Sequence, residues 1–200
     1  MKKIAIALMC TILATGAAMA QKQFTFGPKI GVDYTHYWGK DVGHDGVLNY
    51  QAGLFMEYRF TDRFSVAPEV VFAAQGGKYK WFEFNGAEIS TTDHMNYVNV
   101  PVMLKFYVVP ALSIDFGPQL GINVYHKATD KWTYDGDEHK ETYELEGAKT
   151  VDFGVGLGLT YNIAKDVFVQ GRYTMGMTKV FEGNYNGKNG NAQIAIGYRF

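Results

Sequence analysis

Residues 97–107 read YVNVPVMLKFY, a run of Val, Leu, Phe and Tyr that is typical of a β-strand but contains Pro101 and Lys105. A strand between two neighbours accepts proline only where its backbone is irregular, and lysine is almost never buried without a partner. This strand therefore has to belong to a sheet with one apolar face and one face that can neutralise an ammonium group.

The composition favours strands over helices. The 200 residues include 14 Phe, 14 Tyr and 23 Gly, and the formal net charge is only −1. Aromatic residues are enriched in strands, and a small net charge predicts no nucleic-acid partner. No stretch after residue 20 has the roughly 18 consecutive apolar residues of a membrane helix. If the chain spans a membrane, it has to do so as a closed barrel.

The first twenty residues have the features of a cleaved secretory signal peptide. Two lysines precede an apolar run, and Ala18-Met19-Ala20 has the small-x-small form of a signal-peptidase site. We expect residues 1–20 to be removed and residues 21–200 to form one outer-membrane β-barrel domain. The only cysteine, Cys10, lies in the leader, so we expect no disulfide in the mature chain.

Eight segments alternate between apolar and polar residues with period two, which is the pattern of transmembrane barrel strands. In all eight, the apolar positions contain no Asp, Glu, Lys or Arg. The expected strands are 24–36, 48–60, 64–74, 98–106, 112–124, 151–161, 167–177 and 192–200.

The other face of these strands carries the charges and many glycines. A Lys or Arg facing lipid at the midplane costs roughly 2–4 kcal/mol, whereas side chains fill the lumen of an eight-stranded barrel and can pair there. We therefore expect a lumenal ion-pair network formed by Lys29, Asp33, Glu57, Arg59, Glu69, Lys105, Asp115, Asp152, Arg172 and Arg199. If Phe106 pairs with Leu112, Lys105 lies opposite Ser113 and diagonal to Asp115.

The connections alternate in length. Residues 61–63, 107–111 and 162–166 are tight, whereas 37–47, 75–97, 125–150 and 178–191 are long and polar. Outer-membrane barrels with an even number of strands have short periplasmic turns and longer extracellular loops. We expect an all-β fold, an eight-stranded antiparallel up-and-down transmembrane β-barrel with both termini in the periplasm.

Two irregularities are expected in the strands. Asn85-Gly86 and Asp135-Gly136 predict that loops 75–97 and 125–150 form hairpins that continue above the membrane, the second with Tyr134 paired to Asp137. The register of the first hairpin sets even against odd residues, so one residue has to bulge out. Gly76-Gly77 is the predicted place, because a one-residue slip flips every side chain. Pro101, on the inward side of its strand, is predicted to mark a second bulge.

The chain resembles a known family, the PorT-like small outer-membrane β-barrels. The resemblance rests on YVNVPVMLKFY, on FGPQLGINV at 116–124 and on DFGVGLGLTYNIAKDVFVQGRYTMGMTKV at 152–180, in this order. It implies the fold and an outer-membrane location. Some relatives take part in protein secretion, but no residue here carries that role over.

The last residues, IAIGYRF, place Tyr198 and Phe200 on the apolar face. A terminal aromatic residue after alternating apolar residues resembles the signal by which the outer-membrane assembly machinery recognises its clients. The alternative is simply a last strand.

An enzyme has few candidate residues. Some eight-stranded outer-membrane barrels modify lipids, and Ser90, Asp93 and His94 are the only candidates near the outer rim, where loops commonly collect such residues. The five histidines are scattered, and no cofactor or metal is expected. We interpret the chain as a non-enzymatic barrel.

The predicted function is structural or interactive, such as adhesion, envelope integrity or assistance to an export system. The expected partners are outer-membrane lipid, the assembly machinery and an extracellular or envelope protein that contacts the loops. The main alternative is a secreted, soluble eight-stranded barrel that binds a small apolar ligand, which would be apolar inside and charged outside.

Overall fold

The strands in which apolar and polar residues alternate form a sheet that closes on itself. The computed structural model describes residues 23–39, 45–84, 87–134, 137–145, 147–183 and 186–200. Their ten strands are β1 (Phe24–Trp38), β2 (Val47–Arg59), β3 (Phe64–Gln75), β4 (Lys78–Phe84), β5 (Ala87–Val109), β6 (Leu112–Tyr134), β7 (Asp137–Glu144), β8 (Val151–Asn162), β9 (Val167–Gly176) and β10 (Lys188–Tyr198).

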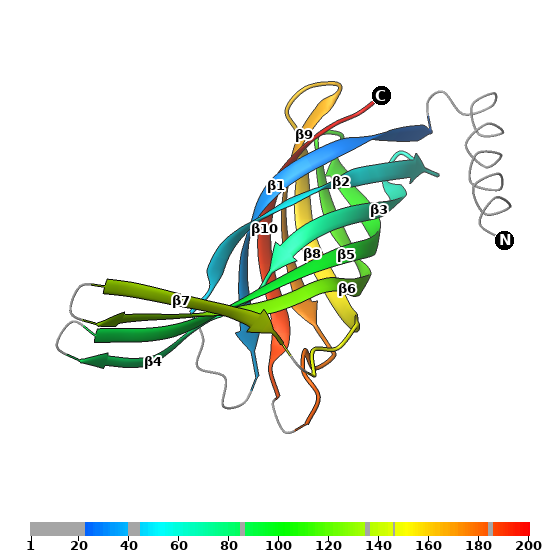
Figure 1. Cartoon of the computed structure of the whole chain (residues 1–200). Coiled ribbons are helices and arrows are strands. Elements are labelled where there is room, and N and C mark those ends of the chain that lie inside the picture. Colours follow the sequence, from blue (N-terminus) through cyan, green and yellow to red (C-terminus); the bar gives the residue numbers. More distant parts are fainter. Residues whose placement is uncertain (1–22, 40–44, 85–86, 135–136, 146, 184–185) are drawn as a thin grey trace, which may run out of the picture.

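Eight of these strands form a closed ring (Figure 1). The order around the ring is β5-β3-β2-β1-β10-β9-β8-β6, and β6 pairs with β5 to complete it. The seam between the first and last strands runs from Lys29 opposite Gly197 to Trp38 opposite Lys188. Every pairing is antiparallel, so the fold is an all-β, up-and-down barrel as predicted.

Strands β5 and β6 continue beyond the ring as two hairpins. Each has 23 residues, about twice the length of most other ring strands. Strand β4 pairs with the free part of β5, and β7 pairs with the free part of β6. The result is a four-stranded sheet, ordered β4-β5-β6-β7, that extends away from the barrel (Figure 1). The sequence analysis placed the membrane-spanning parts of these strands at 98–106 and 112–124 and predicted hairpins in the loops beyond them. The pairs Phe84–Ala87 and Tyr134–Asp137 confirm both hairpins.

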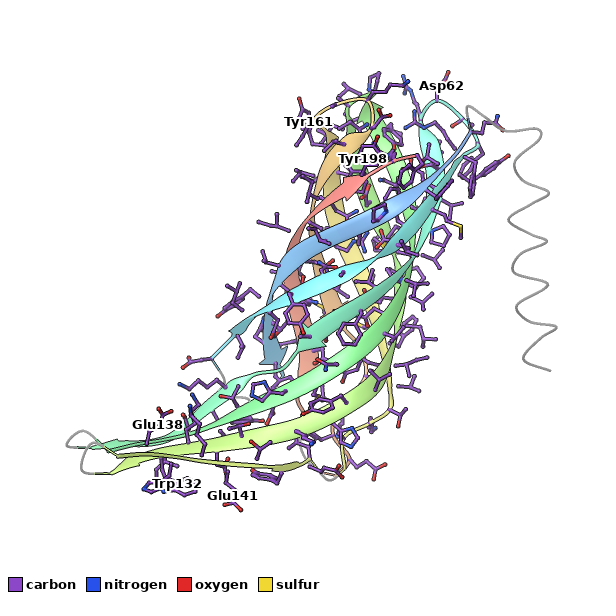
Figure 2. All side chains as sticks on the ribbon, turned by 45° about the horizontal axis from the view of Figure 1, so that its top comes forward. Asp62, Trp132, Glu138, Glu141, Tyr161 and Tyr198 are labelled. Atoms are coloured by element: carbon purple, nitrogen blue, oxygen red, sulfur yellow. The ribbon has the colours of Figure 1, made fainter. Side chains whose placement is uncertain are left out.

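The outer wall of the barrel is apolar and its interior is polar. Leu48, Leu54 and Ile194 are 71%, 65% and 62% exposed. Lys29, Glu69 and Asp115 are buried in the interior, and Figure 2 shows the side chains that project from the outer wall. A soluble carrier of an apolar ligand needs the reverse arrangement, so that alternative is wrong.

Aromatic side chains surround the end of the barrel where β10 terminates. Phe64 lies between Phe60 and Phe106, at ring-centroid distances of 6.4 and 5.2 Å. Phe200 lies 5.6 Å from Phe26 and 5.2 Å from Tyr198. Such a girdle is typical of a membrane–water interface. Within the described ranges, the structure has no helix with the length and hydropathy required to cross a membrane.

The predicted bulge at Gly76-Gly77 is wrong, because the register of the sheet does not change there. The pairs Gln75–Met95 and Lys78–Thr92 share one register, and the slip occurs between Lys80 and Phe82. Gly76 has another role. Its φ of 150° suits glycine, and a Cβ atom there would lie 1.9 Å from the carbonyl oxygen of Asp93.

Two register predictions for β5 are also wrong. Pro101 lies opposite Gln119 without a bulge, and the shifts fall at Asn96/Tyr97 and at Tyr107/Val109. Leu112 pairs with Val109 instead of Phe106, so the strands turn later than predicted, and Lys105 lies directly opposite Asp115 instead of opposite Ser113. Without the shift between Tyr107 and Val109, Lys105 would lie opposite Phe116, and the sequence pattern gives no sign of this shift.

Candidate functional site

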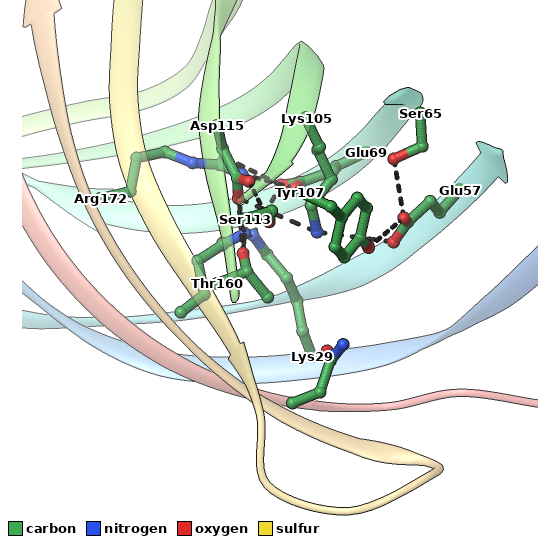
Figure 3. Close-up of polar contacts among 12 residues, drawn as sticks. Lys29, Glu57, Ser65, Glu69, Lys105, Tyr107, Ser113, Asp115, Thr160 and Arg172 are labelled. Atoms are coloured by element: carbon green, nitrogen blue, oxygen red, sulfur yellow. Dashed lines mark hydrogen bonds and ion pairs between the residues drawn. The ribbon is translucent and has the colours of Figure 1, made fainter. Parts of the chain in front are cut away.

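The centre of the lumen contains one carboxylate held by two cations. Glu69 comes from β3, Lys29 from β1 and Arg172 from β9 (Figure 3). The Lys29 ammonium donates to Glu69 Oε2 at 2.6 Å, and the Arg172 guanidinium donates to both carboxylate oxygens at 2.6 and 3.0 Å. We call these three residues the Glu69 clasp. It connects strands that share no backbone ladder.

A second carboxylate, Glu57 on β2, lies closer to the end of the barrel that carries the described termini. It accepts hydrogen bonds from Ser65 at 2.7 Å, from Tyr107 and from Lys105 at 3.4 Å. The guanidinium groups of Arg199 and Arg59 lie 3.8 and 3.9 Å from its oxygens. One buried acid therefore faces several cations.

Asp115 and Gln170 connect these two groups. Asp115 accepts hydrogen bonds from Ser113 at 2.6 Å and from Thr160, and its oxygen lies 3.9 Å from the Lys105 ammonium. Gln170 accepts from Lys29 at 3.0 Å and donates to Asp115 at 3.3 Å. The contacts thus form one connected polar network across the lumen, parts of which Figure 3 shows.

Two predicted members of the ion-pair network make no ion pair with the described residues. Asp33 accepts a hydrogen bond from Gln51 at 2.6 Å. Asp152, near the opposite end of the barrel, accepts from Thr178 and from Asn189, the latter at 2.9 Å. The other eight predicted residues each lie within 4 Å of an oppositely charged group.

The sequence analysis missed the neutral side chains that complete the network. Ser65, Ser113 and Thr160 are fully buried and donate to the carboxylates. They are on the inward face of their strands, so the alternation could have identified them. An ionised carboxylate in a confined space needs several donors, and nearby hydroxyl groups supply them.

Aromatic rings fill the lumen where glycines make room. Phe168 on β9 lies opposite Gly197 on β10, and Phe55 lies opposite Gly27. The two rings meet edge to face at 5.0 Å. A Cβ atom at Gly197 would lie 2.2 Å from the Phe168 ring, so only glycine fits there. Inward glycines facing inward aromatics are the sequence signal for this packing.

Two of the three candidate catalytic residues, Asp93 and His94, have different surroundings. Asp93 and His94 are successive residues of β5, and Asp93 is buried while His94 is exposed. Burial raises the pKa of Asp93 to about 6, opposed by a hydrogen bond from Tyr37 and reinforced by the charge of Asp130. Among the described residues, no three His, Cys, Asp or Glu side chains form a group that could hold a metal ion.

This geometry can be compared with known proteins. The family model described as "Outer membrane protein beta-barrel domain" matches residues 19–182. The chain belongs to this family. Its membership, with the apolar wall and closed ring, makes it an outer-membrane β-barrel protein.

Several solved barrels are similar to this outer-membrane β-barrel. Ail, the attachment invasion locus protein of Yersinia pestis, is 14% identical over 89% of this chain and 99% of its own, with a TM-score of 0.49. Neisserial surface protein A is 12% identical over 88% and 97%, with a TM-score of 0.48. OprG from Pseudomonas aeruginosa is 13% identical over 89% and 95%, with a TM-score of 0.41. A search of curated proteins found no match.

Proposed function

We propose that this outer-membrane barrel has a structural or interaction role and that its protruding sheet is the part that meets a partner. The roles that fit are adhesion, envelope integrity and assistance to an export system. The main support is the extension of β5 and β6 beyond the ring as a four-stranded sheet. Crossing the membrane needs strands of only about ten residues. The extensions are therefore not required for membrane anchoring, which favours a role outside the membrane.

The surface of this sheet suits protein contacts. Trp132 and Tyr143 are 36% and 43% exposed, and the Trp132 ring stacks on His139 at 5.8 Å. Lys131 and Lys140 lie 3.5 and 3.1 Å from Glu138, which leaves both signs of charge beside the aromatic rings. Figure 2 places Trp132, Glu138 and Glu141 at this end of the molecule. Exposed aromatic residues commonly anchor protein interfaces.

The orientation we propose puts the sheet outside the cell and both termini in the periplasm. Three short connections, 60–63, 110–111 and 163–166, lie at the end where β1 begins and β10 ends. The long connections and both hairpins lie at the opposite end. This is the asymmetry of outer-membrane barrels. Protease added to intact cells should cut the hairpins and leave the short turns uncut.

Trimming the hairpins tests the interaction role. In the first variant an Asn-Gly turn replaces residues 129–142 and joins Ala128 to Tyr143, which already face each other. In the second, the same turn replaces 79–91 and joins Lys78 to Thr92. Proteins cross-linked to the full chain in intact cells should be lost from both variants, while insertion into the membrane is unchanged. Equal recovery of the same proteins with full and trimmed chains would reject the proposal.

The last aromatic residues are proposed as the assembly signal. The Phe200 amide donates to the Phe26 carbonyl at 2.8 Å, and its ring is 67% exposed. Phe200→Asp should reduce insertion more than Phe60→Asp, because Phe60 is also an exposed rim aromatic at this end but is not terminal. Equal insertion of the two variants would leave IAIGYRF as an ordinary last strand.

The leader is proposed to be removed. Residues 1–20, the proposed signal peptide, lie outside the described residues, and mass spectrometry of the mature protein should find its N-terminus at Gln21.

Two further parts of the proposal concern the export role and catalysis. The proposed kinship with PorT-like barrels is the reason that assistance to an export system is among the roles. It is tested by comparing the proteins secreted by a deletion strain with those secreted by its parent, and an unchanged set would reject this role. We propose no catalytic activity, since Asp93 is buried while His94, the next residue of β5, is exposed.

A further inference from the structure

Beyond the interaction role, a pocket opens at the end of the barrel that carries the described termini. It has a volume of about 210 Å³, and its lining includes Thr25, Glu57, Arg59, Asn162, Lys165 and Arg199. Three separate parts of the chain bring the cations: Arg59 ends β2, Lys165 lies in the turn between β8 and β9, and Arg199 follows β10. Closure of the ring brings these three cations to the same end of the barrel.

The acids near this pocket are already occupied. Glu57 is the only carboxylate among the described lining residues, and Ser65, Tyr107 and Lys105 donate to it. Lys105 also lies 3.9 Å from Asp115. With Asp115 included, four cations therefore face two carboxylates. Asp62 and Asp166 are in the adjacent turns but do not line the pocket. This leaves an excess of about two positive charges beside the pocket.

The two guanidinium groups are held in place by aromatic rings. Arg59 lies 4.0 Å above the Tyr107 ring, and Arg199 lies 4.5 Å above the Phe168 ring. Arg199 also donates to Asn162 Oδ1 at 2.8 Å. Stacking occupies the faces of these planar groups but leaves N–H bonds at the edges for a ligand. Fixing them in advance reduces the entropy lost on binding.

We propose that this pocket binds a phosphate group. A phosphate monoester or free phosphate carries about −1.5 to −2 charges at pH 7 and has three or more acceptor oxygens, which matches two arginines and a lysine better than one carboxylate does. Thr25 adds a hydroxyl group to the lining. Lys165 is exposed on its turn and completes the charge around the bound anion. The source of the group is either free phosphate or a lipid headgroup at the membrane surface.

Isothermal titration calorimetry tests this site. The purified full chain in detergent is titrated with inorganic phosphate, and a titration with chloride at the same ionic strength is the reference. Saturable binding of one phosphate per chain is expected. Lys165→Ala and Arg59→Ala should each weaken it about tenfold, because each removes a charge-assisted contact. The matched controls are Arg63→Ala, an exposed arginine at the same end outside this pocket, and Lys140→Ala on β7 at the opposite end. Both controls should bind as the unaltered chain does.

A second arm distinguishes the two sources of phosphate. In nanodiscs of phosphatidylcholine with added phosphatidic acid, a headgroup in the pocket should weaken binding of inorganic phosphate relative to phosphatidylcholine alone. Equal binding in the two lipids assigns the site to free phosphate. Absence of saturable heat, or equal weakening by pocket and control variants that all remain folded by circular dichroism, would overturn the proposal.

Discussion

Glu69→Gln should destabilise the barrel more than any other single change to a lumenal charge. The variant keeps the shape of the side chain but removes the negative charge that Lys29 and Arg172 share at 2.6 Å. Both cations are then buried beside a neutral amide. Breaking a buried pair typically costs about 3–5 kcal/mol. Because two cations lose their partner while the amide oxygen still accepts one hydrogen bond, we expect a loss of about 4 kcal/mol, roughly a thousandfold in the unfolding equilibrium.

Urea unfolding of protein refolded in detergent, followed by tryptophan fluorescence, measures this loss. With a slope of about 2 kcal/mol/M, the midpoint should fall by about 2 M. Glu138→Gln, on the exposed hairpin, should leave it unchanged. Adding Lys29→Met to Glu69→Gln should recover part of the loss, because an apolar side chain replaces an unpaired ammonium group. If Glu69→Gln unfolds at the same urea concentration as the unaltered chain, the Glu69 clasp does not stabilise the fold.

The remaining predictions concern other parts of the barrel. Lys105→Met should cost less than Glu69→Gln in the same assay, because its ion-pair distances of 3.4 and 3.9 Å are longer and both acids keep other donors. Gly197→Val should strongly reduce the yield of heat-modifiable, folded barrel because its Cβ meets the Phe168 ring, whereas Gly171→Ala, with open space around it, should fold normally. The pKa of Asp93 is about 6 in the fold and about 3.9 in an unfolded chain, so its ionised form is disfavoured and stability should rise as pH falls from 7 to 4. Asp93→Asn should remove this contribution to the pH dependence and stabilise the protein at pH 7 by roughly 3 kcal/mol, as measured by urea unfolding across this pH range. In planar bilayers, purified protein should show no stable porin-sized conductance steps, because side chains fill the interior of an eight-stranded barrel, and long-lived openings of that size would contradict the filled lumen.

The sequence was sufficient to predict the closed barrel. Lys29, Glu57 and Lys105 each lie in a strand whose other face is apolar. The charged faces of these strands can share one interior only if the strands form a barrel. The Asn-Gly and Asp-Gly turns marked where two hairpins fold back. What alternation cannot determine is how far a hairpin continues past the membrane, because paired strands in water and in lipid follow the same period.

Partner choice within the lumen could not be predicted. Lys29 and Glu69 lie on strands two apart in the ring, and Arg172 reaches the same carboxylate from the other side. Such contacts depend on barrel diameter and stagger as well as on sequence spacing. A local slip also matters, since the shift between Tyr107 and Val109 alone decides whether Lys105 faces Asp115.

The Glu69 clasp constrains the order in which the barrel can form. Arg172 is 103 residues from Glu69 along the chain, and β9 shares no backbone ladder with β3, so Arg172 reaches the carboxylate only when the sheet curls around the lumen. Until then all three charges have to stay hydrated. The lumen therefore loses its water in the final stage of insertion. An intermediate that stops before this stage exposes ionised side chains along an open edge. Any factor that escorts the chain to the membrane has to shelter that edge until the ring closes.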